Sequence, residues 1–210
     1  MHFFASVAVA AGCGLAPWAA ARFATRWMVI AALPFLAVVV AGSAFGIPIY
    51  PWSDVFVAAF GLLAGIALGR AIPPRFRPFL VLLVVLSALD VGQNLAFAGP
   101  VTQSTATGDN PHLIWLNFRF PLNGGHFNIG FADLIVIAAT AENLRRRAAT
   151  LTLSLLPGVI GISLGEALVA TLPPNPPQLA LGIEASLVLF LTAGYVLTEL
   201  AVSQTATKTA

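Results

Sequence analysis

The sequence predicts an all-α polytopic membrane protein, with about seven transmembrane helices and one β-hairpin-like loop on the outer surface. Hydrophobic residues make up 59% of the 210 residues and charged residues 9%, and the mean hydropathy is +0.92. Soluble domains have roughly 45–50% apolar and about 25% charged residues. The apolar residues form long uninterrupted stretches, and the basic residues lie on alternate connectors between them. These three observations together indicate a multi-pass membrane protein.

Seven apolar stretches, each close to the ~20 residues that cross the hydrocarbon core of a bilayer, are predicted as helices. They cover residues 3–20, 27–45, 54–70, 79–98, 128–144, 149–171 and 178–200. Prolines cluster at their ends, in "AIPPRFRP" and "TLPPNPPQ", where a missing N–H leaves no group unsatisfied in lipid. We expect a single transmembrane domain over residues 1–200, followed by a flexible cytoplasmic tail over residues 201–210.

Two of these stretches have distinctive small residues. Cys13 lies in "VAVAAGCG", which looks like a lipoprotein cleavage box, but no basic segment precedes it and the apolar sequence continues to Ala20. We therefore interpret it as part of the first spanning helix. The third stretch contains "AAFGLLAGIALGR", and its glycines and alanines favour close packing against another helix.

The basic residues predict the orientation. Nine of the ten fall on alternate connectors or in the tail, which leaves one, Arg119, on the other side; the nine are Arg22, Arg26, Arg70, Arg75, Arg77, Arg145, Arg146, Arg147 and Lys208. By the positive-inside rule the N-terminus is outside and the C-terminus is cytoplasmic. The net charge of +2 thus comes from topology rather than from a basic patch, and we expect no nucleic-acid partner.

The long connector, residues 99–127, is predicted to lie outside the membrane. Its segment "HLIWLNFRFPLNGG" alternates apolar and other residues, with Ile114, Leu116, Phe118 and Phe120 on one side and Trp115, Asn117 and Arg119 on the other. This alternation is typical of a strand, and the Asn123-Gly124 dipeptide is typical of a hairpin turn. We expect an amphipathic hairpin on the outer membrane surface, covering whatever lies beneath it.

Two aspartates interrupt the predicted fourth and fifth helices. A charged aspartate near the centre of a bilayer costs roughly 2.5–3.5 kcal/mol. Asp90 and Asp133 lie at similar distances from the outer ends of consecutive, antiparallel helices, so we expect their side chains to face each other. Gln93 and Asn94 share the helix face of Asp90. Asn128 and Gly130 precede Asp133, and the glycine allows close approach of a substrate backbone.

Such a pair matches what an aspartyl protease requires, because one carboxylate deprotonates water while the other, protonated, polarises the scissile carbonyl. Two nearby carboxylates share a proton since both cannot easily ionise. Two alternatives stay open. The aspartates are hydrogen-bonded packing residues in one; in the other they act with Glu166 and Glu184, near the outer ends of the last two helices, to carry a cation or protons. Each glutamate taken alone is more typical of an interhelical contact.

No metal or organic cofactor is expected. His112 and His126 lack the spacing of a zinc motif, and the single cysteine excludes an internal disulfide. Nucleotide-binding and serine-hydrolase motifs are absent from the sequence.

The segment "HFNIGFADLIVIAA" resembles the second catalytic motif of lipoprotein signal peptidase (signal peptidase II), Phe-Asn-x-Ala-Asp at the outer start of its last helix. The matching residues are Phe127, Asn128, Ala132 and Asp133, "LNFRF" resembles the strand-like segment before that motif, and "VVLSALDVGQN" supplies Asp90 as the first aspartate. Another alignment, of "DVGQN" and "LNFRFPLNGG" with an earlier part of that family, moves catalysis to Glu166 and Glu184.

A weaker resemblance links "GFAD" and "LPPNPPQLALG" to the Gly-x-Gly-Asp and Pro-Ala-Leu motifs of the presenilin and signal peptide peptidase class. Both resemblances point to Asp90 and Asp133.

The resemblance implies a membrane-embedded aspartyl endopeptidase that cleaves a lipid-modified or signal-peptide-bearing precursor, with membrane lipid as its surroundings. Asp90 and Asp133 would share the acid and base roles, and Asn94, Asn128, Gln93 and Gly130 would contact the water or the peptide. The alternatives from other classes are an ion or proton carrier and a non-catalytic assembly or binding protein on the same scaffold.

Overall fold

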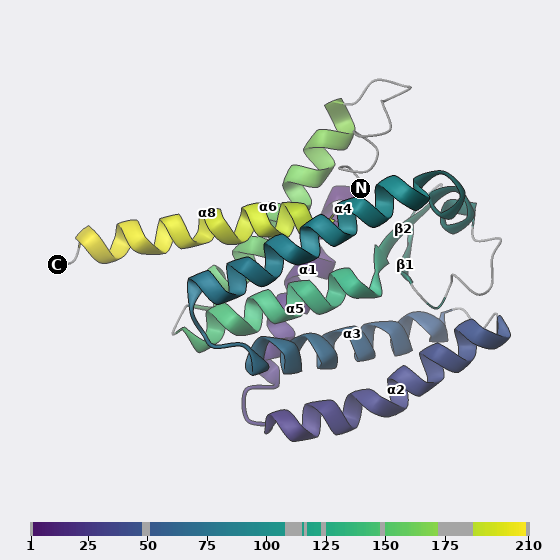
Figure 1. Ribbon diagram of the computed structural model, residues 1–210, viewed down its shortest axis with the longest axis horizontal. Coiled ribbons are helices and arrows are strands. Elements are labelled where there is room, and N and C mark those ends of the chain that lie inside the picture. Colours follow the sequence, from purple (N-terminus) through teal and green to yellow (C-terminus); the bar gives the residue numbers. More distant parts are fainter. Residues whose placement is uncertain are drawn as a thin grey trace.

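The computed structural model describes residues 2–47, 51–107, 115, 117–122, 125–147, 150–171 and 187–208. In these residues the chain is helical apart from one pair of strands (Figure 1). The elements are α1 (His2–Ala19), α2 (Thr25–Phe45), α3 (Trp52–Ala71), α4 (Phe76–Thr107), β1 (Asn117–Leu122), β2 (Gly125–Gly130), α5 (Phe131–Arg146), α6 (Leu151–Thr171) and α8 (Leu187–Lys208).

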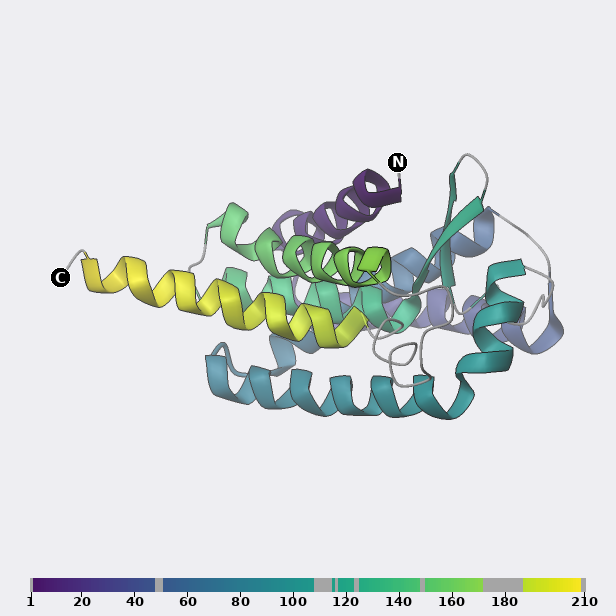
Figure 2. The same ribbon diagram turned by 90° about the horizontal axis from the view of Figure 1, so that it is seen from above.

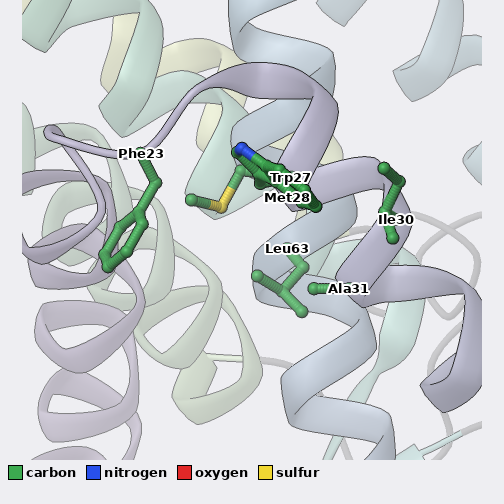
Figure 3. A pocket seen from close by; sticks show the side chains of 6 residues that line it. All are labelled: Phe23, Trp27, Met28, Ile30, Ala31 and Leu63. Atoms are coloured by element: carbon green, nitrogen blue, oxygen red, sulfur yellow. The ribbon is translucent and has the colours of Figure 1, made fainter.

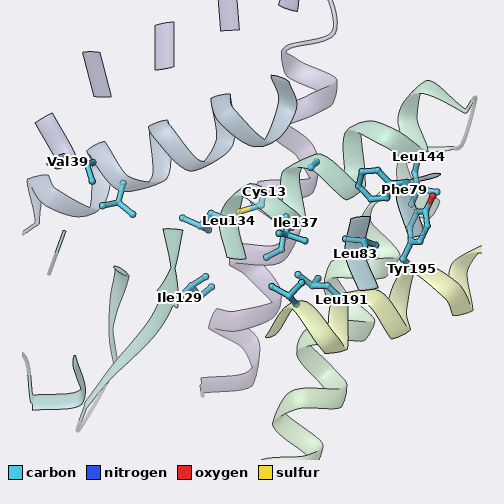
Figure 4. Packing of buried hydrophobic residues seen from close by; sticks show 14 of the residues in the cluster. Cys13, Val39, Phe79, Leu83, Ile129, Leu134, Ile137, Leu144, Leu191 and Tyr195 are labelled. Atoms are coloured by element: carbon cyan, nitrogen blue, oxygen red, sulfur yellow. The ribbon is translucent and has the colours of Figure 1, made fainter. Parts of the chain in front are cut away.

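α5 is the central helix of the bundle. It packs against α1, α3, α6 and α8 (Figures 1 and 2), and ten of its 16 residues are buried. Its Leu134 and Ile137 belong to the main hydrophobic cluster, together with Ile129 of β2 and Leu191 of α8 (Figure 4). A helix that is covered on all sides is typical of the core of a bundle, and α5 therefore fixes the positions of its neighbours.

A row of glycines lets α3 pack directly on the backbone of α5. Gly61, Gly65 and Gly69 line this contact. A Cβ atom on Gly65 would lie 2.4 Å from the carbonyl oxygen of Ile135, and a Cβ on Gly69 would lie 2.6 Å from that of Ala139. The sequence indicated close packing by this helix, and the structure identifies α5 as its partner.

α4 packs along α8, and not on α5 as we expected from their order in the chain. The ring of Phe79 lies 5.3 Å from that of Tyr195 between centroids, and the Ser87 and Thr192 hydroxyls are hydrogen-bonded at 2.9 Å. The expectation assumed that consecutive helices are neighbours. The connector between α4 and α5 is long enough for α8, and not α5, to be the helix that packs along α4.

Two helix ends differ from the prediction because the apolar stretch and the helix do not stop together. α4 ends at Thr107 rather than at residue 98, and its last turns run at a steep angle to the rest (Figure 2). α8 spans Leu187–Lys208 and so ends after the predicted residue 200; it is helical over most of the predicted tail, and the predicted start at residue 178 lies outside the described residues. Hydropathy reports where apolar residues stop, whereas polar segments such as "SQTATK" continue the helix where no proline or glycine interrupts it.

Two of the described helices, α2 and α3, are long and apolar enough to cross a membrane. α2 has 21 residues, of which Met28, Ala32, Val39 and Gly42 are buried. Its outward side chains are apolar as well, since 52% of Ile30 is exposed. No described element covers this side of α2.

The two ends of the bundle differ in charge. The connectors at residues 20–24 and 72–75 and the C-termini of α5 and α8 lie at one end, opposite β1 and β2 (Figure 1). We call these the basic end and the hairpin end. Every lysine and arginine except Arg119 lies at or beside the basic end.

Glu142 connects three segments at the basic end. Its fully buried carboxylate accepts hydrogen bonds from Nε of Arg70 at 2.8 Å and from Nε of Arg145 at 2.7 Å. Arg70 also donates to the carbonyl oxygens of Ala20 and Phe23. We call Glu142 with its two arginines the Glu142 clamp, and it joins α5, α3 and the connector between α1 and α2.

Further bonds reinforce this end. Arg146 donates to the carbonyl oxygens of Arg70 at 2.8 Å and Ile72 at 2.9 Å, and so satisfies acceptors that the end of α3 leaves unpaired. Arg147 forms a two-pronged ion pair with Glu199 of α8, with both N···O distances at 2.7 Å. The C-terminal turn of α5 is thus tied to both of these neighbouring helices.

The glycine contact predicts opposite outcomes for one substitution at two positions. Gly65→Ala should lower the free energy of unfolding by roughly 1–3 kcal/mol through overpacking, although alanine favours a helix by about 1 kcal/mol. Gly12→Ala in α1 should be neutral or stabilising, because no atom lies within 4 Å of the added Cβ. Reversible denaturation of the purified protein in detergent measures both. Equal losses would contradict backbone contact between α3 and α5.

The clamp predicts unequal effects for two glutamates. Glu142→Gln leaves two arginines without their charge partner in a buried site and should cost roughly 3–5 kcal/mol. Glu199→Gln should cost only about 1 kcal/mol or less, because 19% of its side chain and 20% of that of Arg147 are exposed. The same denaturation measurement compares the two. A Glu142→Gln variant as stable as Glu199→Gln would show that the clamp does not hold the basic end together.

Candidate functional site

The hairpin end is built on the pairing of β1 with β2. The strands are antiparallel, with Asn117 opposite Gly130 and Leu122 opposite Gly125. This register leaves two residues between the strands, as in a tight hairpin; Asn123 and Gly124 themselves lie outside the described residues. β2 continues directly into α5, so the hairpin sets the position of the first turn of α5.

Trp115 anchors the segment before β1. Its side chain is buried, and its indole Nε1 donates to the carbonyl oxygen of Ile47 at 2.9 Å. The ring lies against Gly42, where a Cβ atom would come within 2.1 Å of it, and beside the ring of Phe56. The alternating pattern put Trp115 on the same side of the predicted strand as Asn117 and Arg119. Such a pattern indicates the two sides of a strand, and it does not predict burial of one side chain between α2 and α3.

α5 begins at Phe131, and not at residue 128 as predicted. Residues 125–130 pair with β1, and the Asp133 carboxylate accepts a hydrogen bond from the backbone N–H of Gly130 at 3.1 Å. An acidic side chain that reaches back to the residue before the helix is a recognised start signal. Asn128 therefore lies in β2, opposite Arg119.

Gly130 has a structural role at the start of α5, and its predicted role in the approach of a substrate backbone stays a prediction. Its φ of −62° is open to any residue, so its backbone conformation does not require glycine. A Cβ atom there would lie 2.9 Å from Oδ2 of Asp133. The absence of a side chain at Gly130 thus makes room for the Asp133 carboxylate.

The structure brings Asp90 and Asp133 near enough for the charges of their carboxyl groups to interact. Asp90 lies near the middle of α4, which touches β2, and Asp133 lies in the first turn of α5. Both side chains are half-buried, and their charges act on each other. This proximity arises where α4 passes the hairpin and not from packing of α4 on α5; that the two side chains face each other as a pair stays a prediction.

The other predicted residues that the structure describes lie on α4 and α6. Gln93 and Asn94 follow Asp90 by about one turn of α4 and so share its helix face. Glu166 lies on α6, which packs on α1, α5 and α8. Glu184 lies outside the described residues, so the grouping of four carboxylates stays a prediction. Among the described residues, no three His, Cys, Asp or Glu side chains are close enough to hold a metal ion.

A third carboxylate, which was not predicted from the sequence, lies at the hairpin end. Asp54 lies in the first turn of α3, and only 5% of it is exposed; the adjacent Ser53 is fully buried. Negative charge is favourable in the first turn of a helix. The short segment "PWSDV" carries this start signal, but nothing in the pattern shows that the carboxylate is buried.

Comparison with known proteins adds no relative. No family model, curated protein or solved structure matches this chain. The resemblance to lipoprotein signal peptidase therefore rests on the residues that carry it, and it enters the functional interpretation as a proposal.

Proposed function

We propose that this chain is a membrane-embedded aspartyl endopeptidase in which Asp90 and Asp133 form the catalytic pair. The observation that carries the proposal is that α4, which bears Asp90, touches β2, and β2 leads directly into the first turn of α5, which bears Asp133. The two carboxyl charges are near enough to interact, and the segment around Asp133 resembles a catalytic motif of lipoprotein signal peptidase. The two carboxyl groups share the acid and base roles.

A seven-span membrane location is part of this proposal. Large apolar side chains are exposed over the outer faces of several helices: Val29, Ile30, Leu33 and Val40 on α2, Val81, Val84, Val85 and Leu89 on α4, and Leu197 and Leu200 on α8. Soluble monomers rarely expose contiguous apolar patches larger than a few hundred Å². The collection of basic residues at one end supports a cytoplasmic basic end, and an outer hairpin end follows.

The reaction is peptide-bond hydrolysis. One carboxylate removes a proton from a water molecule, whose oxygen attacks the scissile carbonyl carbon while the other, protonated carboxyl donates to the carbonyl oxygen. The carbon–nitrogen bond then breaks, and the leaving nitrogen takes a proton from the pair. The substrate class is a lipid-modified or signal-peptide-bearing precursor, whose apolar segment enters the site from the membrane, beneath the hairpin.

One observation favours a structural role for Asp133 as a second candidate. Its bond to the Gly130 N–H fixes the start of α5 without any chemistry. In that case the pair is part of a non-catalytic binding or assembly protein. Asparagine separates the two possibilities, because its side-chain oxygen still accepts the Gly130 hydrogen bond whereas its amide cannot exchange the catalytic proton.

The membrane orientation predicts the position of two reporters. A reporter fused after Lys208 should be cytoplasmic, and one inserted near Gly108 should be outside, because the basic residues favour the cytoplasmic side. Protease protection in intact and opened cells reads both positions. Two reporters on one side of the membrane would contradict the seven-span arrangement.

The pair predicts a specific pattern of activity loss. Asp90→Asn and Asp133→Asn should each reduce precursor cleavage roughly 10²–10⁴-fold, since each removes a proton-transfer group. The double variant should be little worse than either single one, because the groups act as a unit. Cleavage of lipid-modified and plain signal-bearing precursors by the purified protein in liposomes measures this, with thermal unfolding as the check on folding.

Asp54→Asn is the matched control, because it neutralises another aspartate at the same end of the bundle. It should keep most of the activity, and Glu166→Gln and Glu184→Gln should have mild effects. Unchanged cleavage by Asp133→Asn would leave the structural role as its explanation. If the parent protein cleaves no precursor, and all four substitutions at Asp90, Asp133, Glu166 and Glu184 impair ion flux in the same liposomes, the carrier alternative replaces the protease.

A further inference from the structure

An apolar groove of about 590 Å³ opens on the membrane-facing side of α2, close to the basic end. Six hydrophobic side chains line it, and Figure 3 shows Phe23 of the connector across from the residues of α2 and α3: Phe23, Trp27, Met28, Ile30, Ala31 and Leu63. The groove is open to the surroundings of the protein, since Phe23, Trp27 and Ile30 are each more than half exposed. Apolar walls of this kind suit a hydrocarbon chain, and they offer little to hold a peptide backbone.

Positive charge lies at the rim of the groove. The guanidinium of Arg26 lies 5.5 Å from the centre of the Trp27 ring, which is part of the wall. Arg22 precedes Phe23 in the same connector, and both arginines are exposed. Within the described part of the chain, the ion pairs involve Arg70, Arg145 and Arg147 and neither of these two. The rim is therefore complementary to an anionic group.

The Glu142 clamp holds the connector in this arrangement. Arg70, paired with Glu142, donates to the carbonyl oxygens of Ala20 and Phe23 on either side of Arg22. The backbone between the end of α1 and the start of α2 is thus fixed from the interior. The groove and its charged rim are held by the fold itself.

We propose that this groove binds one anionic phospholipid of the cytoplasmic leaflet, with an acyl chain along Trp27, Ala31 and Leu63 and the phosphate at Arg22 and Arg26. The groove starts within the first two turns of α2, the depth at which headgroups give way to acyl chains. The cytoplasmic leaflet is the one that carries anionic lipids. The proposal rests on the membrane location and is independent of the Asp90 and Asp133 chemistry.

Quenching of Trp27 fluorescence by brominated phospholipids tests the site in the full chain. Trp18→Phe and Trp52→Phe leave Trp27 with the buried Trp115 as the only tryptophans. The protein is placed in phosphatidylcholine vesicles with increasing fractions of brominated phosphatidylglycerol or brominated phosphatidylcholine. An arginine near a membrane surface contributes about 1 kcal/mol, or roughly five-fold in association. Two arginines should therefore favour the anionic lipid by roughly 25-fold.

Matched variants separate this site from general attraction to the surface. Arg22→Gln with Arg26→Gln should bring the preference close to one. Arg75→Gln with Arg77→Gln, which removes two exposed arginines where the connector from α3 enters α4 at the same end, should leave the lipid preference unchanged, as should Asp90→Asn. Equal quenching by both lipids in the parent would overturn the proposal, and so would an equal effect of the two arginine pairs. Precursor cleavage, measured separately, shows whether the protease proposal stands.

Discussion

The close approach of α3 to α5 is the contact on which the rest of the structure depends. Side chains larger than hydrogen at Gly65 and Gly69 would meet the backbone of α5, so the two helices lie together only because these positions are glycine. α5 is covered on its other sides by α1, α6 and α8. It carries Asp133 near one end and Glu142 near the other, about 14 Å apart along a regular helix. A shift of α5 relative to α3 would therefore disturb both ends together.

The Glu142 clamp completes this contact at the basic end. Gly69 lets α5 come close enough for its Glu142 side chain to pack against α3, and the next residue, Arg70, pairs with that carboxylate. Removing charges from water is expensive, and a buried ion pair is retained only when its geometry and hydrogen bonds are good. Here one carboxylate accepts three bonds from two arginines. The same Arg70 fixes the connector beside α2, so packing in the interior determines the shape of a groove on the surface.

Local features of this fold follow from the sequence, and its long-range contacts do not. Hydropathy located the helices, but their ends depend on hydrogen bonds, as at Phe131, where strand pairing and the Asp133 cap start α5. Glycine content indicated a close contact for residues 54–70, yet only the structure shows that α5 is the partner. From its place near a helix end in the sequence, Glu142 is predicted to lie at the membrane interface, whereas tertiary packing buries it completely. The facing pair of Asp90 and Asp133 stays a prediction, and the helices that carry them pack differently from the expectation on which it was based.

In the proposed protease, the cap on α5 constrains how Asp133 takes part in the reaction. Its Oδ2 accepts the Gly130 N–H, so Oδ1 is the oxygen left for a proton or a water molecule. A side chain held by its own backbone loses little further freedom when a substrate binds, and such preorganisation favours catalysis. Gly130 suits this arrangement, because a Cβ atom there would lie 2.9 Å from Oδ2 and the carboxylate would have to shift. In the sequence Gly130-Phe131-Ala132-Asp133, the glycine admits the carboxylate, and the carboxylate starts the helix that holds it in place.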